Sequence, residues 1–237
     1  MKIQLFCILL LTMLVGCASP PAHADKKINV LVVTGGHPFK AGSFYKLFQD
    51  NTNLTFTTDQ QIKAAEVYDR PDLFNYDVVV LYDSPVNITD VEKARFLALF
   101  EHGIGVVVLH HAYLSYPMWP EYGRIAGGQY IYRQEQLDSG LKTSTYKGNV
   151  DIPVTVVDKN NPITAGLNDF VLHDELYSHM HMIGQVTPLL KTGDELLAWT
   201  RTEKKSRVVG IIVGHGCYDD PNFQKLLAQS IRWAARR

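Results

Sequence analysis

The sequence predicts one α/β domain whose sheet is doubly wound and mainly parallel, with helices on both faces. Short apolar runs rich in β-branched residues recur through residues 28–109, and segments of helical pattern separate them. The runs are spaced by about 25 residues or more, which is typical of β-α-β units. Because the crossover between parallel strands is right-handed, successive units of this kind build a doubly wound sheet.

The first half of the domain is expected to supply the parallel strands. Gly35 and Gly36 end the first strand, and Thr89 and Glu92 have the spacing of a capping box that starts a helix. Gly103 has the position of the glycine that ends this helix. The predicted order is strand 28–34, helix 41–49, strand 54–58, strand 76–82, helix 91–102 and strand 105–109.

The pattern changes in the second half, where strand-like runs follow one another with turns between them. Turn signals occur at residues 160–162 and 192–194. Asp220 and Pro221 form an N-cap and N1 pair, so we expect a C-terminal helix to start there. The predicted strands cover residues 152–157, 170–177, 195–201 and 207–213.

The first residues have the pattern of a bacterial lipoprotein signal. Lys2 precedes an apolar run over residues 3–15, which is shorter than the about 20 residues of a membrane-spanning helix. The run ends in the lipobox pattern L-V-G-C, in which the Cys17 thiol would receive diacylglycerol. An ordinary signal peptide cleaved near Ala22 or Ala24, and an uncleaved anchor, are the alternatives.

We therefore expect a signal peptide over residues 1–16, a polar tether over 17–27 and the folded domain over 28–237. The mature chain would be attached by its lipid to a membrane of the cell envelope. Ala18 follows the cysteine, which in a Gram-negative cell favours the outer membrane.

The net charge and the cysteine content bear on the expected partners and disulfides. The net charge is −1 and no basic stripe occurs, so no nucleic-acid partner is expected. Cys7 would leave with the signal and Cys17 would carry the lipid. Only Cys217 then remains of three cysteines, so no intramolecular disulfide is expected. Cys217 is a candidate ligand or nucleophile, with a packed thiol as the alternative.

Histidines gather where predicted strands end. His37 follows the first strand, His110 and His111 follow the strand over 105–109, and His215 follows the last predicted strand. Ligands of open α/β sheets bind beyond the carboxyl ends of the strands. We therefore expect these side chains to contribute to one site.

We interpret His37, His111 and His215 as ligands of a divalent metal, with Zn²⁺ favoured, because imidazole nitrogens suit such an ion. Neighbouring strand residues point to opposite faces, so only one of His110 and His111 is expected to point into the cleft. His111 is preferred as the ligand because it lies further into the turn, and His110 is a candidate to contact substrate. The alternative is that these histidines satisfy loop backbone groups or cap helices. No compact motif such as H-E-x-x-H accompanies them.

Acidic and aromatic residues complete the expected site. Asp174 and Glu175 are candidates for general acid-base catalysis, and Glu175 could also complete the metal coordination. An exposed strand edge is the alternative for this pair. Trp119, Tyr122 and Tyr177 are candidates to contact a sugar ring, although each could belong to the hydrophobic core instead.

Several common chemistries lack their motifs. There is no G-x-x-x-x-G-K-[ST], no G-x-G-x-x-G after the first strand and no G-x-S-x-G. A phosphate-binding P-loop, a nicotinamide site and a serine-hydrolase elbow are therefore not predicted.

Several segments together resemble the ThuA-like, or trehalose utilization, family, in order and over nearly the whole domain. The segments are G-G-H at 35–37, G-V-V-V-L-H-H-A at 105–112, W-P-E-Y-G-R-I-A-G-G at 119–128, N-P-I-T-A-G-L at 161–167, D-E-L-Y at 174–177, G-H-G at 214–216, P-N-F at 221–223 and I-R-W-A at 231–234.

The resemblance implies a flavodoxin-like sheet, similar to that of class I glutamine amidotransferases, and a role in sugar metabolism that includes oxidised (3-keto) disaccharides. In that superfamily a cysteine lies on the sharp turn after a central strand. Here the turn carries His110 and His111 with no cysteine near it, so glutaminase activity is not expected.

Two functions remain open at this point. The first is a metal-dependent envelope enzyme that hydrolyses or eliminates the bond of a glycoside or keto-glycoside, or isomerises the keto-sugar. The second is a non-catalytic surface lipoprotein that binds a sugar through the same groups and needs no metal.

Overall fold

The computed structural model describes residues 26–61 and 66–237. The predicted signal peptide, Cys17 and most of the predicted tether lie outside these residues. Among the described residues, no helix combines the length and hydrophobicity that a membrane span requires.

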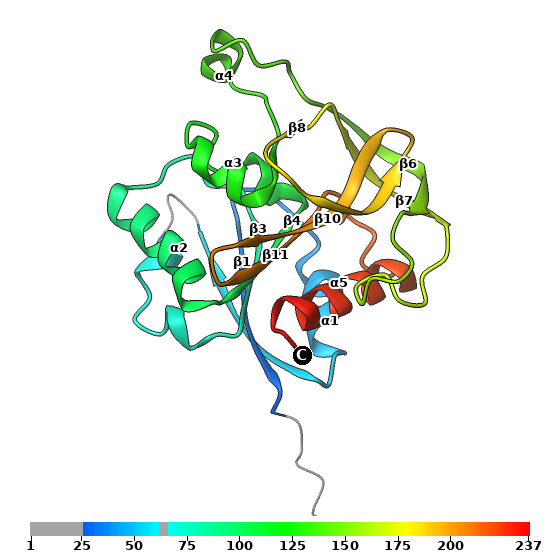
Figure 1. Cartoon of the computed structure of the whole chain (residues 1–237), viewed down its shortest axis with the longest axis horizontal. Coiled ribbons are helices and arrows are strands. Elements are labelled where there is room, and N and C mark those ends of the chain that lie inside the picture. Colours follow the sequence, from blue (N-terminus) through cyan, green and yellow to red (C-terminus); the bar gives the residue numbers. More distant parts are fainter. Residues whose placement is uncertain (1–25, 62–65) are drawn as a thin grey trace, which may run out of the picture.

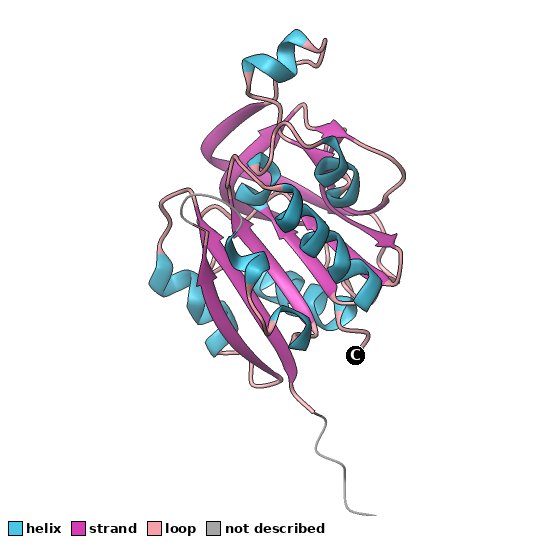
Figure 2. Cartoon of the chain, turned by 90° about the vertical axis from the view of Figure 1, so that its left-hand side faces the viewer, coloured by secondary structure: helices cyan, strands magenta, loops and turns pink. Residues whose placement is uncertain are grey.

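One mixed sheet forms the centre of the domain (Figures 1 and 2). Its strand order is β2-β1-β3-β4-β11-β10-β9-β6-β7. The first five strands of that order run parallel, and the other four continue the sheet in antiparallel pairing. The strands are β1 (Ile28–Gly35), β2 (Leu54–Gln60), β3 (Val78–Asp83), β4 (Gly105–Leu109), β6 (Thr145–Val156), β7 (Phe170–Ser178), β9 (Thr187–Thr192), β10 (Glu195–Glu203) and β11 (Ser206–Ile211).

Helices cover both faces of the parallel half, which confirms the predicted fold class. Alternate residues of β1 belong to two separate cores, with Val30 and Val32 on one face and Leu31 and Val33 on the other. Helices α1 (Ala41–Gln49) and α5 (Pro221–Ala234) pack on the first face. Helices α2 (Asp90–His102) and α3 (Pro120–Ala126) pack on the second.

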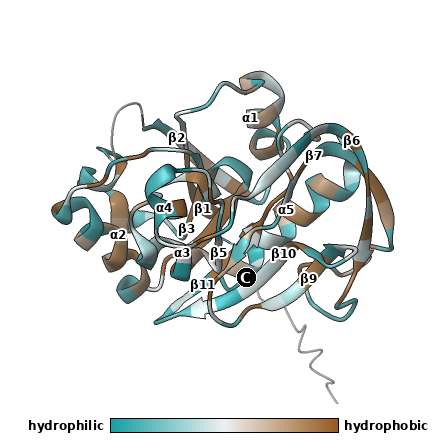
Figure 3. Cartoon of the chain, turned by 90° about the horizontal axis from the view of Figure 1, so that it is seen from above, coloured by the Kyte–Doolittle hydropathy of each residue, from teal (hydrophilic) through white to brown (hydrophobic). Residues whose placement is uncertain are grey.

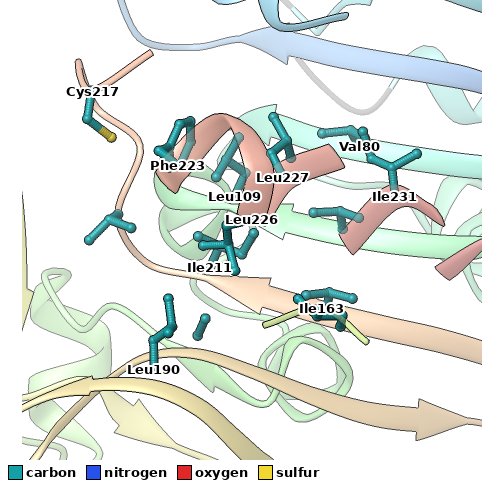
Figure 4. Packing of buried hydrophobic residues seen from close by; sticks show 14 of the residues in the cluster. Val80, Leu109, Ile163, Leu190, Ile211, Cys217, Phe223, Leu226, Leu227 and Ile231 are labelled. Carbon is teal, nitrogen blue, oxygen red and sulfur yellow. The ribbon is translucent and has the colours of Figure 1, made fainter. Parts of the chain in front are cut away.

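The predicted buried face of α5 is confirmed. Phe223, Leu226, Leu227 and Ile231 lie over the sheet strands that carry Val80, Leu109 and Ile211 (Figure 4). Hydropathy coloured on the ribbon shows the same arrangement, with hydrophobic residues concentrated on the strands and on the inner sides of the helices (Figure 3).

Local signals set the helix boundaries as expected. The Thr89 side chain accepts from the Glu92 N–H while the Glu92 carboxylate accepts from the Thr89 N–H, so the capping box is formed. Gly103 is left-handed and ends α2, and the Asp220 carboxylate accepts two N–H groups of α5.

Several elements were not predicted. They are α3, α4 (Gln134–Asp138), the short pair β5 (Gly128–Gln129) and β8 (His181–Met182), strand β9, and the 3-10 turns Glu66–Asp69, Leu73–Asn75 and His110–Leu114. Each is short or interrupted by proline or polar residues, so its periodicity is weak. Strand β6 also starts at Thr145, well before the predicted start at 152, because its first residues form an exposed two-stranded ribbon with β7.

A buried acid lies at the carboxyl end of β3. Asp83 is 1% exposed, and its carboxylate accepts a hydrogen bond of 2.6 Å from the Gln61 side-chain amide. Burial raises the pKa of Asp83 to about 7, against the lowering effects of its backbone hydrogen bond and of Gln61. The folded protein therefore retains a proton that an unfolded aspartate, with a pKa of about 3.9, has released.

The sign of this linkage gives a testable pH dependence. Between about pH 4 and pH 7 the folded state binds more protons at Asp83 than the unfolded state, so the Asp83 contribution to the free energy of unfolding falls as pH rises, by at most about 1.4 kcal/mol per unit. Urea unfolding of wild type and Asp83→Asn from pH 4.5 to 8 should show the variant gaining relative stability with pH. Asp194→Asn, an exposed acid in a turn, is the control. Parallel curves for wild type and Asp83→Asn would contradict the assignment.

Candidate functional site

Four histidines meet at the carboxyl ends of three parallel strands. His37 follows β1, His110 and His111 follow β4, and His215 lies in the loop after β11. The ring centroid of His111 is 4.0 Å from that of His37 and 5.3 Å from that of His215. The structure therefore brings together the predicted histidines, which are up to 178 positions apart in the chain.

Glycines at tight turns place two of these histidines. Gly36 has a φ of +76°, and a Cβ there would come within 2.6 Å of the Ser84 hydroxyl oxygen. Gly214 has a φ of +122°, with Leu109 and Phe223 carbons 3.0 Å from the position a Cβ would take. Both turns need glycine, because other residues rarely adopt this backbone conformation and would also clash.

His110 occupies a constrained position behind the cluster. Its φ is +42°, which is uncommon for a residue with a Cβ, and it is fully buried. Its Nδ1 lies 2.5 Å from the Ile212 carbonyl oxygen and must carry the hydrogen, because a carbonyl only accepts. Its Nε2 faces the Glu175 carboxylate at 3.4 Å. The His110 ring also stacks on Tyr177, with centroids 4.3 Å apart.

His111 has the properties of a neutral nitrogen ligand. Among the described residues, neither of its ring nitrogens has a hydrogen-bond partner, although the side chain is buried. Burial, followed by the charges of His110, His37 and His215, lowers the pKa of His111 to about 2. Burial and the neighbouring histidines also lower the pKa of His215. A buried imidazole without partners is costly unless another group occupies its lone pair.

Two groups of side chains have the spacing to hold a cation. The donor atoms of His37, His111 and His215 lie within 4.8 Å of one another, as do those of His110, Glu175 and His215. The first group consists of the three predicted ligands. The second adds Glu175 and His110 through the shared His215.

Asp174 lies beside the site, but its carboxylate is hydrogen-bonded to backbone N–H groups. Its carboxylate accepts from the N–H groups of Gly214 at 2.6 Å, His215 at 3.2 Å and Gly216 at 2.8 Å. Asp174 therefore positions the loop that carries His215, and its oxygens are not free for the acid-base role predicted from the sequence.

Cys217 also contacts this carboxylate. Its thiol lies 3.3 Å from an Asp174 oxygen, and burial, followed by the charge of Asp174, raises the pKa of the thiol well above its usual range. Such a thiol stays protonated and is a poor nucleophile, which favours the packed alternative.

Two of the aromatic residues predicted to contact a sugar lie elsewhere. Tyr122 is 1% exposed and its hydroxyl donates to the Ala112 carbonyl oxygen. Trp119 packs against Phe96 and Tyr116 in the same core. Both belong to the hydrophobic core under α2 and α3, so the core alternative holds for them.

A cleft of about 620 Å³ opens beside the histidines. Residues 38–40 after β1 and residues 215 and 216 after β11 line it, together with Gly148, Asn149, His173, Asp174 and Glu175 of the β6–β7 ribbon. The sequence reasoning missed four side chains that line it: Phe39, Lys40, Asn149 and His173. Phe39 and Lys40 lie within a few residues of His37, whereas Asn149 and His173 come from strands whose pairing the sequence does not reveal.

Comparisons with known proteins agree with this fold. The sequence model of the ThuA family, described as trehalose utilisation, matches residues 29–234. No curated protein sequence is similar enough to be matched.

Among solved structures, a ThuA-like protein from Parabacteroides merdae is 21% identical, with a TM-score of 0.73 over 89% of this chain and 90% of its own. A ThuA-like protein from Bacteroides uniformis is also 21% identical, with a TM-score of 0.67 over 91% and 95%. A protein named as a GMP synthase A subunit from Thermoplasma acidophilum is 8% identical, with a TM-score of 0.50 over 89% and 95%. These likenesses show a shared fold.

Because Asp174 accepts three backbone hydrogen bonds, we expect its replacement by the isosteric asparagine to lower the free energy of unfolding substantially. Asp174→Asn replaces one carboxylate oxygen by an NH₂ group that faces backbone N–H donors, so we expect a loss of about 2–3 kcal/mol in the free energy of unfolding. Urea unfolding measures it. Asp151→Asn, on the same ribbon with a side chain 75% exposed, should cost less than about 0.5 kcal/mol. Equal small losses in both variants would show that Asp174 does not hold the loop.

Proposed function

The chain belongs to the ThuA family, described as trehalose utilisation, and we propose that it is a divalent-metal-dependent enzyme acting on glycosides or keto-glycosides at the cell envelope. The reaction is hydrolysis or elimination of the glycosidic bond, or isomerisation of the keto-sugar. Family membership supports a carbohydrate-related role, and the histidine cluster supports the dependence on metal.

The observation that carries the proposal is the convergence of His37, His111 and His215. Their donor atoms share one small volume, and buried His111 has no other described partner for either ring nitrogen. The His37 Nδ1 is 2.8 Å from the Pro38 carbonyl oxygen, which leaves its Nε2 available. Three imidazole nitrogens that converge on one small volume are a donor set that suits a catalytic zinc ion.

The remaining residues have separable roles in this proposal. A divalent cation supplies Lewis acidity, which polarises a carbonyl or lowers the pKa of water. Glu175 is the carboxylate beside the histidines and is the candidate to move a proton. The His110 ring, whose Nε2 lies 3.4 Å from the carboxylate, lowers the pKa of Glu175 together with His215 and His37, against the opposing effect of burial. Asp174 acts as a positioning residue through the loop that carries His215.

The cleft supports a small polar substrate. Its volume of about 620 Å³ lies in the range of about 300–1,000 Å³ that holds small molecules. Lys40, Asn149 and His173 offer hydrogen-bonding groups along its wall. A sugar unit that enters here would have its reacting carbons next to Glu175 and the histidines.

The envelope location is proposed from the lipobox alone. In this proposal the Cys17 thiol carries the lipid and the following residues act as a tether, so that the domain is held at a membrane. The tether precedes the amino end of β1, whereas His37 follows the carboxyl end of the same strand. The cleft would then face away from the point of attachment.

Metal content tests the central claim. The chain from residue 26 onward, purified without a histidine tag, should contain close to one equivalent of zinc, manganese, nickel or iron by elemental analysis. His37→Ala and His215→Ala should lose most of this metal, because each removes one of three ligands. His173→Ala is the matched control, since this histidine lines the same cleft but contacts Asp151 and Asn149 instead.

A wild-type protein that holds no metal, even after incubation with Zn²⁺ and dialysis, would contradict the proposed enzyme. The non-catalytic sugar-binding lipoprotein would then be the better explanation. Equal metal loss in His173→Ala would show that the ion is bound elsewhere.

Lipid attachment is tested separately in cells. Cys17→Ser should abolish incorporation of labelled fatty acid and move the protein from the membrane fraction to the soluble fraction. Cys7→Ser is the control, because this cysteine lies in the apolar run that a lipoprotein signal peptidase would remove. A mature chain that begins near residue 23 or 25 without label would favour the ordinary signal peptide.

A further inference from the structure

Four tyrosines lie near the histidine cleft. They differ from Trp119 and Tyr122, which belong to the hydrophobic core. Tyr130 and Tyr132 lie between β5 and α4, Tyr146 lies on β6, and Tyr177 lies on β7. Two of them are exposed: Tyr146 by 67% and Tyr132 by 37%. Large aromatic side chains at the surface beside a cleft are a frequent mark of a ligand site. We call these four residues the tyrosine row.

The rings of the tyrosine row connect the surface to the histidines. The ring centroids of Tyr132 and Tyr130 are 6.3 Å apart, and those of Tyr130 and Tyr177 are 4.8 Å apart. Tyr177 then stacks on His110, which contacts His111 at 4.7 Å between ring centroids. A continuous series of rings therefore leads from exposed Tyr132 to the predicted metal ligands.

Tyr146 belongs to the same face of the ribbon. It is the register partner of Tyr177 in the antiparallel pairing of β6 with β7, and opposed residues in such a pair project from one face. Burial, followed by the charges of Glu175 and Tyr146, raises the pKa of Tyr130. Tyr146 and Tyr177 therefore lie side by side on one face of the ribbon, Tyr146 exposed and Tyr177 buried.

An irregularity in β6 joins this face to the cleft. The register shifts between Lys147 and Val150, and Gly148 lies two positions after Tyr146 on the same face. A Cβ at Gly148 would meet only one atom within 4 Å, a Glu175 carboxylate oxygen at 3.4 Å. Gly148, Glu175 and His215 line the cleft, so Tyr146 lies two positions along β6 from a residue of the cleft wall.

We propose that exposed Tyr146, which lies beside Tyr177 on the ribbon, forms a subsite that stacks on one pyranose ring of a neutral glycoside whose other unit occupies the histidine cleft. Tyrosine offers a large rigid face at low entropic cost and a hydroxyl for hydrogen bonding, which suits the apolar face and polar rim of a sugar. The inference rests on the proposed carbohydrate function and specifies that the ligand contains at least two sugar units.

The test compares a disaccharide with a monosaccharide. Trehalose and glucose are titrated into metal-loaded wild type, Tyr146→Ala and Tyr146→Phe, with binding followed by calorimetry or ligand-detected NMR. Because Tyr146 is exposed, neither substitution should affect folding, which circular dichroism checks. Val171→Ala, 60% exposed on the same ribbon, is the control. Wild type should bind trehalose more tightly than glucose.

Tyr146→Ala should weaken trehalose binding about tenfold and leave glucose binding unchanged, whereas Tyr146→Phe should stay within about twofold of wild type. Equal trehalose affinity in wild type and Tyr146→Ala would overturn the subsite while leaving the metal-dependent function intact. Failure of metal-loaded wild type to bind trehalose would overturn the subsite for this ligand class. A chain without metal contradicts the proposed enzyme independently of any result at Tyr146.

Discussion

The Asp174 carboxylate is the contact on which the site depends. It lies on β7, in the antiparallel half of the sheet, and accepts the N–H groups of residues 214–216, which follow a parallel strand. This contact fixes the loop that carries His215 against the strand that carries Glu175. Without it, the two walls of the cleft would have no polar connection at this point, and one predicted metal ligand would be free to move.

The histidine cluster is held in place at an energetic cost. His110 has an uncommon left-handed backbone conformation, and His111 is buried without a described partner for its ring nitrogens. Burial and mutual repulsion keep His111 neutral. Such features are retained at functional sites because the surrounding packing, here the helix–sheet core and the turns at Gly36 and Gly214, stabilises them.

The antiparallel half of the sheet adds side chains to the site that the parallel strands position. The parallel strands bring the histidines to one edge, as in other open α/β sheets. The ribbon of β6 and β7 then adds further lining residues, with Glu175 beside the histidines and Tyr146 and Tyr177 paired on one of its faces. The comparisons are consistent with these separate contributions, since the shared fold covers 89% and 91% of the chain while the lining of the cleft depends on side chains that the fold does not specify.

The sequence by itself determined the fold class, the capping of α2 and α5, and the meeting of His37, His111 and His215. These features depend on short-range periodicity, on caps within one helical turn, and on the rule that parallel strands share an edge. Only the tertiary structure decided which acidic and aromatic residues reach the cleft, because strand pairing over long separations sets the direction of each side chain. The pairing of β6 with β7 places the Asp174 carboxylate against the backbone of residues 214–216 and leaves Tyr146 at the surface near the cleft. The packing of α3 places Trp119 and Tyr122 in the core.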